Sequence, residues 1–323
     1  SIMKKKWFWI AVVLMILFGF SIGYWFQRNK NSNTGQTESQ TKLKENTKET
    51  GETYTGITSE EETETADTDP EESQTESVTE GTEEYRGFVI DNVLQSEKEG
   101  DIHYNVYIPE SYDGTKAYAL YFTLPGYEGL YFQGVAANIR SEDFGFEAQK
   151  YNSEMIIVAP QLNDWGETSA DQTIALVEYF LEHYNIDQEK VYASGYSGGG
   201  ETMSIVAGKR PDLFTAYLQV SSRWDGDYET VVKAHLPVYL AIGRNDEYYG
   251  SEPTIQAYQT LHDLYEKQGL TEQEIDKLLV LDVKEHSYFT ERNAPNEHGG
   301  GGFFAYDEEI MGWLFSQERS DSL

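Results

Sequence analysis

The sequence contains no cysteine, and only 24 lysine and arginine residues stand against 56 aspartate and glutamate residues. The absence of cysteine excludes a disulfide framework and any metal site built on thiolates. The formal net charge of -32 argues against nucleic acid as a partner, because phosphate binding requires clustered basic side chains. A substrate that approaches this surface is expected to be neutral or cationic, or to reach a site shielded from the charge.

Long apolar runs are also scarce, and one stands out. Residues 7–26 carry no charge, have aromatic residues at both ends and are long enough to cross a bilayer as a helix. Because three lysines precede this run, we expect residues 1–6 to be a cytoplasmic stub and residues 7–26 a single-pass anchor. Everything after the anchor is then extracellular, as on the surface of a Gram-positive bacterium. A cleaved signal peptide is the alternative, although no clear small-residue cleavage motif follows the run.

The next segment, residues 27–84, is rich in threonine, glutamate, serine and glutamine and has almost no large apolar side chains. Such a composition cannot bury enough surface to offset the entropy of ordering the chain. It predicts a disordered acidic stalk. From residue 85 the composition changes to one that can fold, so residues 85–323 are predicted to form a single domain.

Apolar runs within that domain predict eight strands, at residues 87–94, 103–108, 118–124, 155–159, 191–194, 216–220, 238–242 and 278–283. Helical patterns occupy residues 169–184, 201–208, 253–268 and 306–315. Strands that alternate with helices indicate an α/β domain, in which a mostly parallel sheet is covered on both faces. Ligands of such sheets bind at the carboxyl ends of the strands.

The strongest local signal is the pentapeptide Gly195-Tyr196-Ser197-Gly198-Gly199, which follows a strand pattern and precedes a helical one. A serine on so sharp a turn crowds the backbone around it, so the positions two before and two after must lack side chains. Gly195 and Gly199 meet that requirement. Ser197 would then project from the sheet edge as a nucleophile, above the positive end of a helix dipole. An ordinary glycine-rich turn is the alternative interpretation.

A serine hydroxyl is a weak nucleophile, so this interpretation requires a base and an acid that orients the base. Asp246 follows the predicted strand at residues 238–242 and is the preferred acid, with Asp225, after the preceding strand, as the alternative. His298 is the preferred base because it lies in a glycine-rich, flexible loop just before the last predicted helix. His286, near the end of the last predicted strand, is the alternative base.

Two backbone amides are needed to stabilise the negative oxygen that forms during acyl transfer. We expect one at Gly198, directly after the nucleophile. The other is expected at Tyr127, in the Pro125-Gly126 loop that follows the predicted strand at residues 118–124. A plain strand-ending turn is the alternative for this loop.

Aromatic residues are frequent near the predicted mouth of the site, at Tyr127, Tyr131, Trp165, Trp224, Tyr248, Tyr249 and Phe303. The candidate substrate-binding residues are Trp165, Tyr196, Trp224 and Tyr248, because aromatic rings can stack a sugar or an aromatic acyl group. Core packing is the alternative for at least half of these aromatic residues.

Taken together, the turn around Ser197, the Pro125-Gly126-Tyr127-Glu128-Gly129 loop, Gly243-Arg244-Asn245-Asp246 and His298 resemble the α/β-hydrolase superfamily. Residues 184–200 are similar to secreted esterases of the feruloyl esterase and polyhydroxyalkanoate depolymerase group, and to small prolyl-oligopeptidase-like hydrolases. The resemblance covers roughly residues 87–315. The chain departs from those families at the oxyanion loop, where they usually have His-Gly and this chain has Pro125-Gly126. The hydrogen bonds with which a histidine side chain would brace the loop are therefore missing.

This resemblance implies an α/β-hydrolase fold with a mostly parallel eight-stranded sheet. It also implies a Ser-His-Asp triad that hydrolyses carboxylic esters through an acyl-enzyme, with no metal or organic cofactor. Small-molecule or polysaccharide-linked esters are the expected substrates, and the membrane is contacted through the N-terminal helix. Two other functions remain open: a serine peptidase of the prolyl-oligopeptidase-like type, and a catalytically inactive hydrolase fold that acts as a binding module. The sequence does not indicate an oligomeric state.

Overall fold

The structure, a computed structural model, describes residues 76–319. The predicted stub, the predicted anchor at residues 7–26 and most of the predicted stalk lie outside the described residues. Within residues 76–319, no helix is both long and apolar enough to span a membrane.

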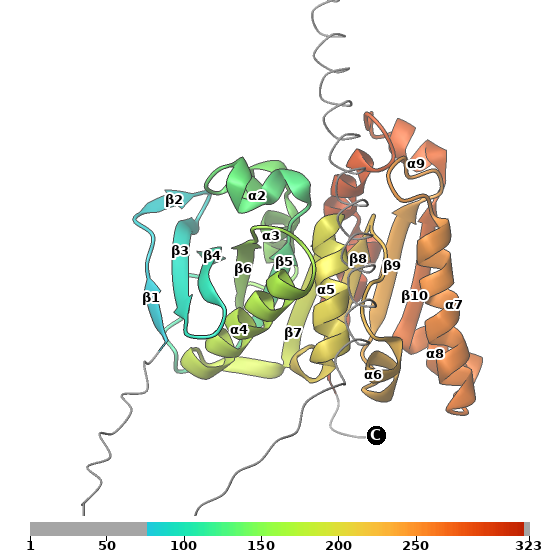
Figure 1. The fold of residues 1–323 in the computed structure, drawn as a ribbon, viewed down its shortest axis with the longest axis horizontal. Coiled ribbons are helices and arrows are strands. Elements are labelled where there is room, and N and C mark those ends of the chain that lie inside the picture. Colours follow the sequence, from blue (N-terminus) through green and yellow to red (C-terminus); the bar gives the residue numbers. More distant parts are fainter. Residues whose placement is uncertain (1–75, 320–323) are drawn as a thin grey trace, which may run out of the picture. The chain divides into compact units, whose positions relative to one another are not determined.

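A mixed sheet of ten strands forms the centre of this region (Figure 1). Its strands are β1 (Ser77–Thr79), β2 (Glu83–Tyr85), β3 (Phe88–Ser96), β4 (Gly100–Tyr107), β5 (Tyr118–Leu124), β6 (Met155–Gln161), β7 (Ile186–Tyr196), β8 (Ala216–Val220), β9 (Val238–Gly243) and β10 (Leu279–Lys284). Their order is β1-β3-β4-β6-β5-β7-β8-β9-β10, with β2 paired to β3. All strand pairs from β6 to β10 are parallel, and those among β1, β2, β3, β4 and β6 are antiparallel.

The prediction of eight strands was wrong by two, because β1 lies before the expected start of the domain at residue 85 and β2 ends at that residue. Both are three residues long and mostly polar, with the sequences SVT and EEY. They pair antiparallel with β3, and the amide of Gly81 between them donates to the Asn92 side chain at 3.0 Å. Backbone hydrogen bonds hold such edge strands, so a search for apolar runs does not detect them.

Strands at the centre of the sheet are apolar along their whole length because both of their faces are covered. Every residue of β5, β6, β8 and β9 is buried. In β3, by contrast, buried and half-buried residues alternate, as expected of a strand near an edge. Continuous apolar runs therefore mark the parallel centre of the sheet, where the carboxyl ends of β5, β7, β8 and β9 meet.

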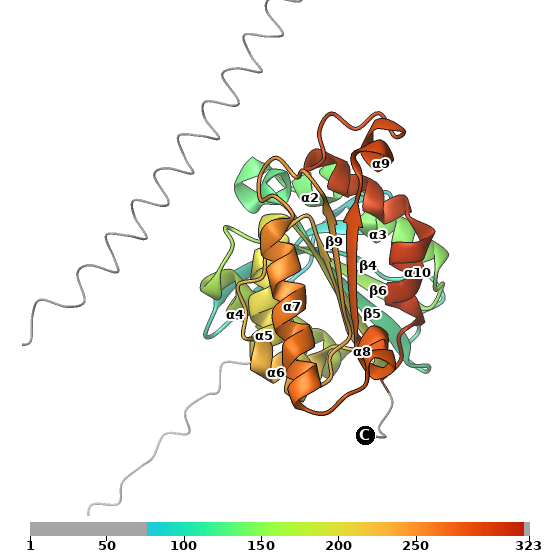
Figure 2. The same cartoon turned by 90° about the vertical axis from the view of Figure 1, so that its right-hand side faces the viewer.

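Helices cover the two faces of the sheet (Figure 2). One face carries α4 (Glu167–His183), α5 (Gly198–Lys209), α6 (Tyr228–Lys233) and α7 (Glu252–Lys267), whose buried residues form one core cluster with the sheet. The other face carries α3 (Phe144–Glu147) and α10 (Glu308–Ser316), which contribute to a second cluster. The four helices predicted from the sequence correspond to α4, α5, α7 and α10.

Shorter helices connect these elements and were not predicted from the sequence. They are α2 (Ala137–Ser141), α8 (Glu272–Leu278), α9 (His286–Thr290), η1 (Tyr127–Gly129), η2 (Tyr131–Gln133), η3 (Ala148–Lys150), η4 (Pro211–Leu213) and η5 (Gly299–Tyr306), together with α3 and α6 above. One or two turns are too short to show an apolar period. The 3₁₀ helix η5 replaces the flexible glycine-rich loop that we expected after His298.

Candidate active site

Ser197 lies at the sharp turn between β7 and α5 and has a strained backbone, with φ of 54° and ψ of -124°. The flanking glycines permit this turn. A Cβ atom on Gly195 would lie 2.5 Å from the carbonyl oxygen of Gly199, and one on Gly199 would lie 2.4 Å from that of Pro125. The Ser197 amide donates to the Val220 carbonyl at 3.0 Å, which fixes the turn against the end of β8.

Three of the predicted site residues form a continuous hydrogen-bonded array. The Ser197 Oγ atom lies 3.1 Å from Nε2 of His298, and Nδ1 of His298 lies 2.8 Å from Oδ2 of Asp246. The His298 side chain is 22% exposed and that of Asp246 is fully buried. The array therefore runs from a buried carboxylate to a hydroxyl at the mouth of the site.

Asp246 is held by more than its contact with His298. Its second oxygen, Oδ1, accepts the backbone amides of Tyr248 at 3.0 Å and Tyr249 at 2.8 Å. Donors on both oxygens fix the plane of the carboxyl group. A fixed carboxylate can in turn hold the imidazole of His298 in the tautomer whose Nε2 faces Ser197 as an acceptor.

The two alternative candidates lie elsewhere. His286 is 72% exposed, and its Nδ1 atom contacts Glu297 at 2.9 Å. Asp225 forms an ion pair with Arg223 at 3.2 Å, and its side chain makes no contact with His298. Their positions in the sequence allowed either residue to take part in the site. In the structure each contacts a different residue, and neither belongs to the array.

Two side chains hold the segment that carries His298 through three hydrogen bonds that the sequence analysis missed. The Glu247 carboxylate accepts the amide of Glu297 at 3.0 Å and that of His298 at 2.9 Å. The Tyr196 hydroxyl donates to the carbonyl of His298 at 2.7 Å. Glu247 adjoins Asp246 in the sequence, but nothing in the pattern of residues indicates that its side chain reaches a loop fifty residues later.

The predicted oxyanion donors are both unoccupied amides. Among residues 76–319, neither the Tyr127 amide nor the Gly198 amide donates to any protein acceptor. The loop that carries Tyr127 lies directly against Ser197, since a Cβ atom on Gly126 would lie 3.4 Å from Cβ of Ser197. Free amides beside a serine hydroxyl are the feature that stabilisation of a tetrahedral anion would require.

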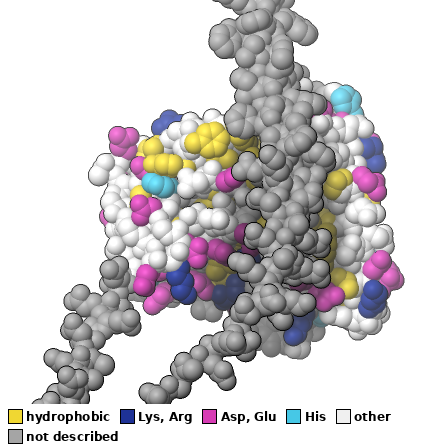
Figure 3. Space-filling model, in the orientation of Figure 1, with side chains coloured by type: hydrophobic (Ala, Val, Ile, Leu, Met, Phe, Trp, Pro, Cys, Tyr) yellow, Lys and Arg dark blue, Asp and Glu magenta, His cyan; other side chains and the backbone are white. Residues whose placement is uncertain are grey.

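Two of the candidate substrate-binding residues lie at the array. The ring of Trp165 covers Gly198, where an added Cβ atom would lie 2.6 Å from Cε3 of the indole. The ring of Tyr248 lies 5.3 Å from that of His298 and is 56% exposed. Beyond them, Figure 3 shows hydrophobic side chains gathered over the segment that contains α2, where Phe132 and Val135 are exposed.

The other two candidates have packing contacts instead. Trp224 is buried, stacks on Tyr228 and packs against Tyr217, and its indole nitrogen donates to a neighbouring carbonyl. Tyr196 stacks behind His298, with ring centroids 5.9 Å apart, and burial raises its pKa above the usual range. Both residues belong to segments that border the site, as predicted. Their side chains, however, point into the protein.

A buried carboxyl group that was not anticipated lies on the helix that begins directly after Ser197. Glu201, on the first turn of α5, accepts a hydrogen bond from the Tyr249 hydroxyl at 2.6 Å and lies 3.5 Å from Nε of Arg223. Burial and the Glu201 carboxylate raise the pKa of Tyr249, so this hydroxyl remains a donor at neutral pH. The site is therefore bordered by the neutral hydroxyl of Tyr249 and by the ion pair of Glu201 with Arg223.

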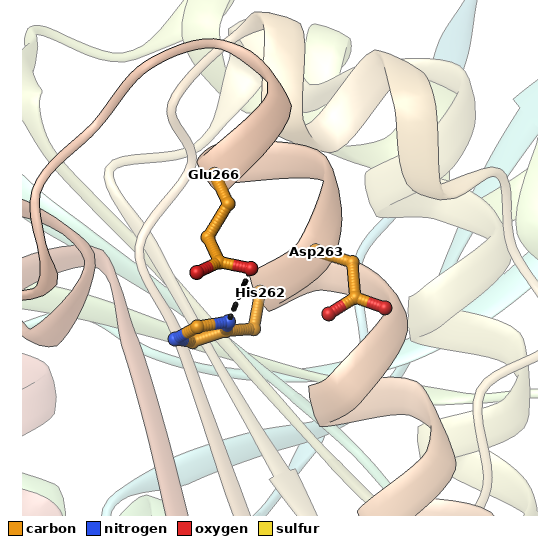
Figure 4. Close-up of side chains that lie close together, drawn as sticks. All are labelled: His262, Asp263 and Glu266. Atoms are coloured by element: carbon orange, nitrogen blue, oxygen red, sulfur yellow. Dashed lines mark ion pairs between the residues drawn. The ribbon is translucent and has the colours of Figure 1, made fainter.

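A cluster on α7 has the residue types of a metal site, and it is formed by His262, Asp263 and Glu266 (Figure 4). Nδ1 of His262 lies 3.8 Å from Glu266, while Nε2 lies 3.0 Å from Glu272 on α8. The hydrogen bond to Glu272 raises the pKa of His262 and favours the imidazolium, which has no lone pair for a metal. The contact with Glu272 ties α7 to α8 as an ion pair, while the contact with Glu266 lies within α7.

The strand order, the helices on both faces and the turn at Ser197 define an α/β-hydrolase fold. A solved structure described as a thermostable esterase shares this fold, with a TM-score of 0.59 and 20% sequence identity over 72% of this chain and 64% of that one. At this identity the likeness concerns the fold.

Sequence relatives agree with that class. Residues 161–271 match the prolyl oligopeptidase family, and this range includes Ser197 and Asp246 but ends before His298. A probable feruloyl esterase C of Aspergillus terreus is 30% identical over 117 residues, which are 35% of this chain and 43% of that protein. An acetylxylan esterase of Coprinopsis cinerea is 31% identical over 84 residues, which are 26% of this chain and 21% of that protein. The chain thus matches less than half the length of these relatives.

Proposed function

We propose that this chain is a serine hydrolase that cleaves carboxylic esters through an acyl-enzyme. The observation that carries the proposal is the array from Ser197 through His298 to Asp246, beside two unoccupied amides. The esterase names of two sequence relatives support the choice of ester over other acyl compounds. No step of this reaction requires a metal or an organic cofactor.

In the first half of the reaction, Ser197 attacks the ester carbonyl carbon while its proton passes to Nε2 of His298. The carbonyl electron pair moves onto oxygen, and the Tyr127 and Gly198 amides stabilise that charge. Asp246 stabilises the imidazolium through Nδ1. When the carbon–oxygen bond to the alcohol breaks, His298 returns the proton to the leaving alcohol.

In the second half, water replaces the alcohol. His298 takes a proton from the attacking water, a second tetrahedral anion forms at the same two amides, and its collapse releases the acid. Ser197 regains its proton from His298. The cycle therefore uses one base, one orienting carboxylate and one anion site twice.

The substrate class that fits best is an acyl group linked to a carbohydrate. The exposed rings of Tyr248 and Phe132 and the Trp165 indole offer flat apolar surfaces near the site, and such surfaces stack sugars and aromatic acids. Two sequence relatives, a probable feruloyl esterase and an acetylxylan esterase, support this choice.

The test is covalent labelling followed by a substrate panel. We expect a fluorophosphonate probe to label the full chain at Ser197, located by mass spectrometry of the peptides. We expect 4-nitrophenyl acetate, methyl ferulate and acetylated xylan to be hydrolysed faster than a proline-peptide anilide. Labelling with none of these esters cleaved would contradict the proposed ester specificity.

The same experiment distinguishes the two other functions. The match of residues 161–271 to the prolyl oligopeptidase family favours a serine peptidase as the second candidate. Faster cleavage of the anilide than of the esters would establish that candidate. A folded chain that the probe does not label would instead indicate a binding module.

We also propose that the enzyme is held at the outer face of the cell membrane by residues 7–26. The support is their uncharged apolar sequence behind three lysines. Protease added to intact cells is expected to release the domain into the medium and leave a membrane-bound fragment. Resistance to protease until the cells are lysed would contradict this location.

A further inference from the structure

The loop that carries Tyr127 has Pro125-Gly126 where the related families usually have His-Gly. A side chain from outside the loop, that of Glu142, forms a hydrogen bond with it instead. The amide of Gly126 donates to Oε1 of Glu142 at 2.7 Å. A Cβ atom on Gly126 would lie 3.4 Å from Cβ of Ser197 and 3.5 Å from the same Glu142 oxygen. Gly126 thus lies close to both Ser197 and the Glu142 carboxyl.

Glu142 can act as a brace because its own backbone is anchored. It caps the C-terminal end of α2, and its amide donates to the carbonyl of Asn138 at 3.1 Å. The Asn138 side chain is buried, donates to the carbonyls of Ala159 and Pro160 on β6, and accepts from Asn105 on β4 at 2.7 Å. The sheet therefore fixes α2, and α2 fixes the carboxyl.

The loop and α2 also approach each other too closely to move independently. A Cβ atom on Gly129 would lie 2.5 Å from Cβ of Pro125 and 2.8 Å from Cα of Asn138. A small pocket remains between them, lined by Thr123, Pro125, Asn138, Ile139, Glu142, Gly145 and Ala159. The carboxyl of Glu142 thus lies in a defined position under the loop.

We propose that Glu142 is a positioning residue for the oxyanion loop. By accepting the Gly126 amide, it orients the Gly126–Tyr127 peptide so that the Tyr127 amide stays free beside Ser197. This inference rests on the proposed ester hydrolysis, since it concerns the anion that this reaction forms. Glu142 thereby supports the loop as the histidine of the related families is expected to do, but from outside the loop.

The charge state of Glu142 suits this position. Burial raises the pKa of the carboxyl from 4.5 to about 8, and the hydrogen bond from Gly126 opposes the rise. The other ionisable groups that act on it are Glu128 on η1, Tyr121 on β5 and Tyr196 on β7, none of which is basic. Near neutral pH the carboxyl is mostly protonated, so it holds the loop without a negative charge beside the developing oxyanion.

The test compares Glu142→Gln, which keeps the acceptor, with Glu142→Leu, which removes it. We expect Glu142→Leu to lower kcat for 4-nitrophenyl acetate about 10- to 100-fold, because a displaced oxyanion donor costs that much. We expect Glu142→Gln to stay within about threefold of the wild type, since an amide oxygen accepts the Gly126 amide equally well. Glu147→Gln on α3, whose carboxylate pairs with Lys150, is the matched control and should leave kcat unchanged.

A pH profile adds a readout that a merely structural role would not affect. Above about pH 8 the wild-type Glu142 ionises and places a negative charge near the anion site. The ratio of kcat for Glu142→Gln to that for the wild type should therefore be constant at low pH and rise as pH increases through about 8. The wild type and the variant share all other ionisable groups, so the effect of their titration cancels in the ratio of the two kcat values.

The outcomes separate the two proposals. A wild type that hydrolyses esters, with Glu142→Leu equally fast, would overturn the positioning role and leave the proposed function intact. An equal loss of kcat in the Leu and Gln variants, together with an equal fall in melting temperature, would assign Glu142 to folding alone and also overturn the role. A wild type that neither hydrolyses esters nor reacts with the fluorophosphonate would overturn the proposed function itself.

Discussion

Ser197→Ala and His298→Ala are each expected to lower kcat for the preferred ester by about 10⁶-fold, and the double variant no further than either single one. The 3.1 Å contact between Oγ and Nε2 is the reason. The two residues act as a unit, because the hydroxyl needs the base to attack the ester, and without Ser197 no acyl-enzyme forms for His298 to hydrolyse. Residual activity over the uncatalysed rate should remain in all three variants, since the Tyr127 and Gly198 amides still stabilise the anion.

The matched control for this prediction is His286→Ala. His286 is exposed and contacts Glu297, so its removal should leave kcat close to the wild-type value. Thermal melting of every variant shows whether the fold is retained. A large loss of kcat in His286→Ala with little loss in His298→Ala would move the base to His286, and strictly additive losses in the double variant would show that Ser197 and His298 do not act together.

Much of the fold could be predicted because the centre of the sheet is so apolar. The strands β5, β6, β8 and β9 are buried along their whole length, and their apolar runs are visible without any structure. The turn at Ser197 could be predicted for a related reason. A Cβ atom on Gly199 would lie 2.4 Å from the carbonyl oxygen of Pro125, so only glycine is tolerated there and the sequence shows the constraint.

The brace of the oxyanion loop could not be predicted in this way. Glu142 and Glu247 both act by accepting backbone amides of residues far from them in the chain. Every residue except proline has a backbone amide that can donate. The sequence therefore does not indicate which residue such a glutamate will contact. In a chain with 56 acidic residues, the few that support the site look like those on the surface.

The aromatic residues illustrate a second limit, which concerns side-chain direction. Tyr196 and Tyr248 both adjoin array residues in space, yet Tyr196 turns under His298 whereas Tyr248 points to solvent. Trp224 follows the strand β8, as a rim residue should, but its ring enters the core beside Tyr217. Sequence position predicts which loop carries a residue, while packing decides which way the residue faces.

The environment of Asp246 makes its replacement by asparagine informative. Oδ1 accepts two backbone amides, from Tyr248 and Tyr249, and Oδ2 accepts the proton on Nδ1 of His298. A carboxylate satisfies all three donors, but an amide side chain has only one oxygen. If that oxygen faces the two amides, the NH₂ group faces His298 and forces the proton onto Nε2. If the oxygen faces His298, the NH₂ group opposes two donors, and the loop must move.

Asp246→Asn is therefore expected to lower kcat by about 10⁴-fold at neutral pH, with a smaller change in KM. When the asparagine oxygen faces the two backbone amides, Nε2 of His298 carries a proton and can no longer accept one from Ser197. The Tyr127 and Gly198 amides and the aromatic side chains near the site are unchanged. The kinetics of the preferred ester measure this effect. Asp225→Asn is the matched control, because Asp225 pairs with Arg223 and not with His298, and it should keep near wild-type kcat. A larger loss in Asp225→Asn than in Asp246→Asn would assign the orienting role to Asp225 and would mean that the 2.8 Å contact between Asp246 and His298 does not govern the tautomer.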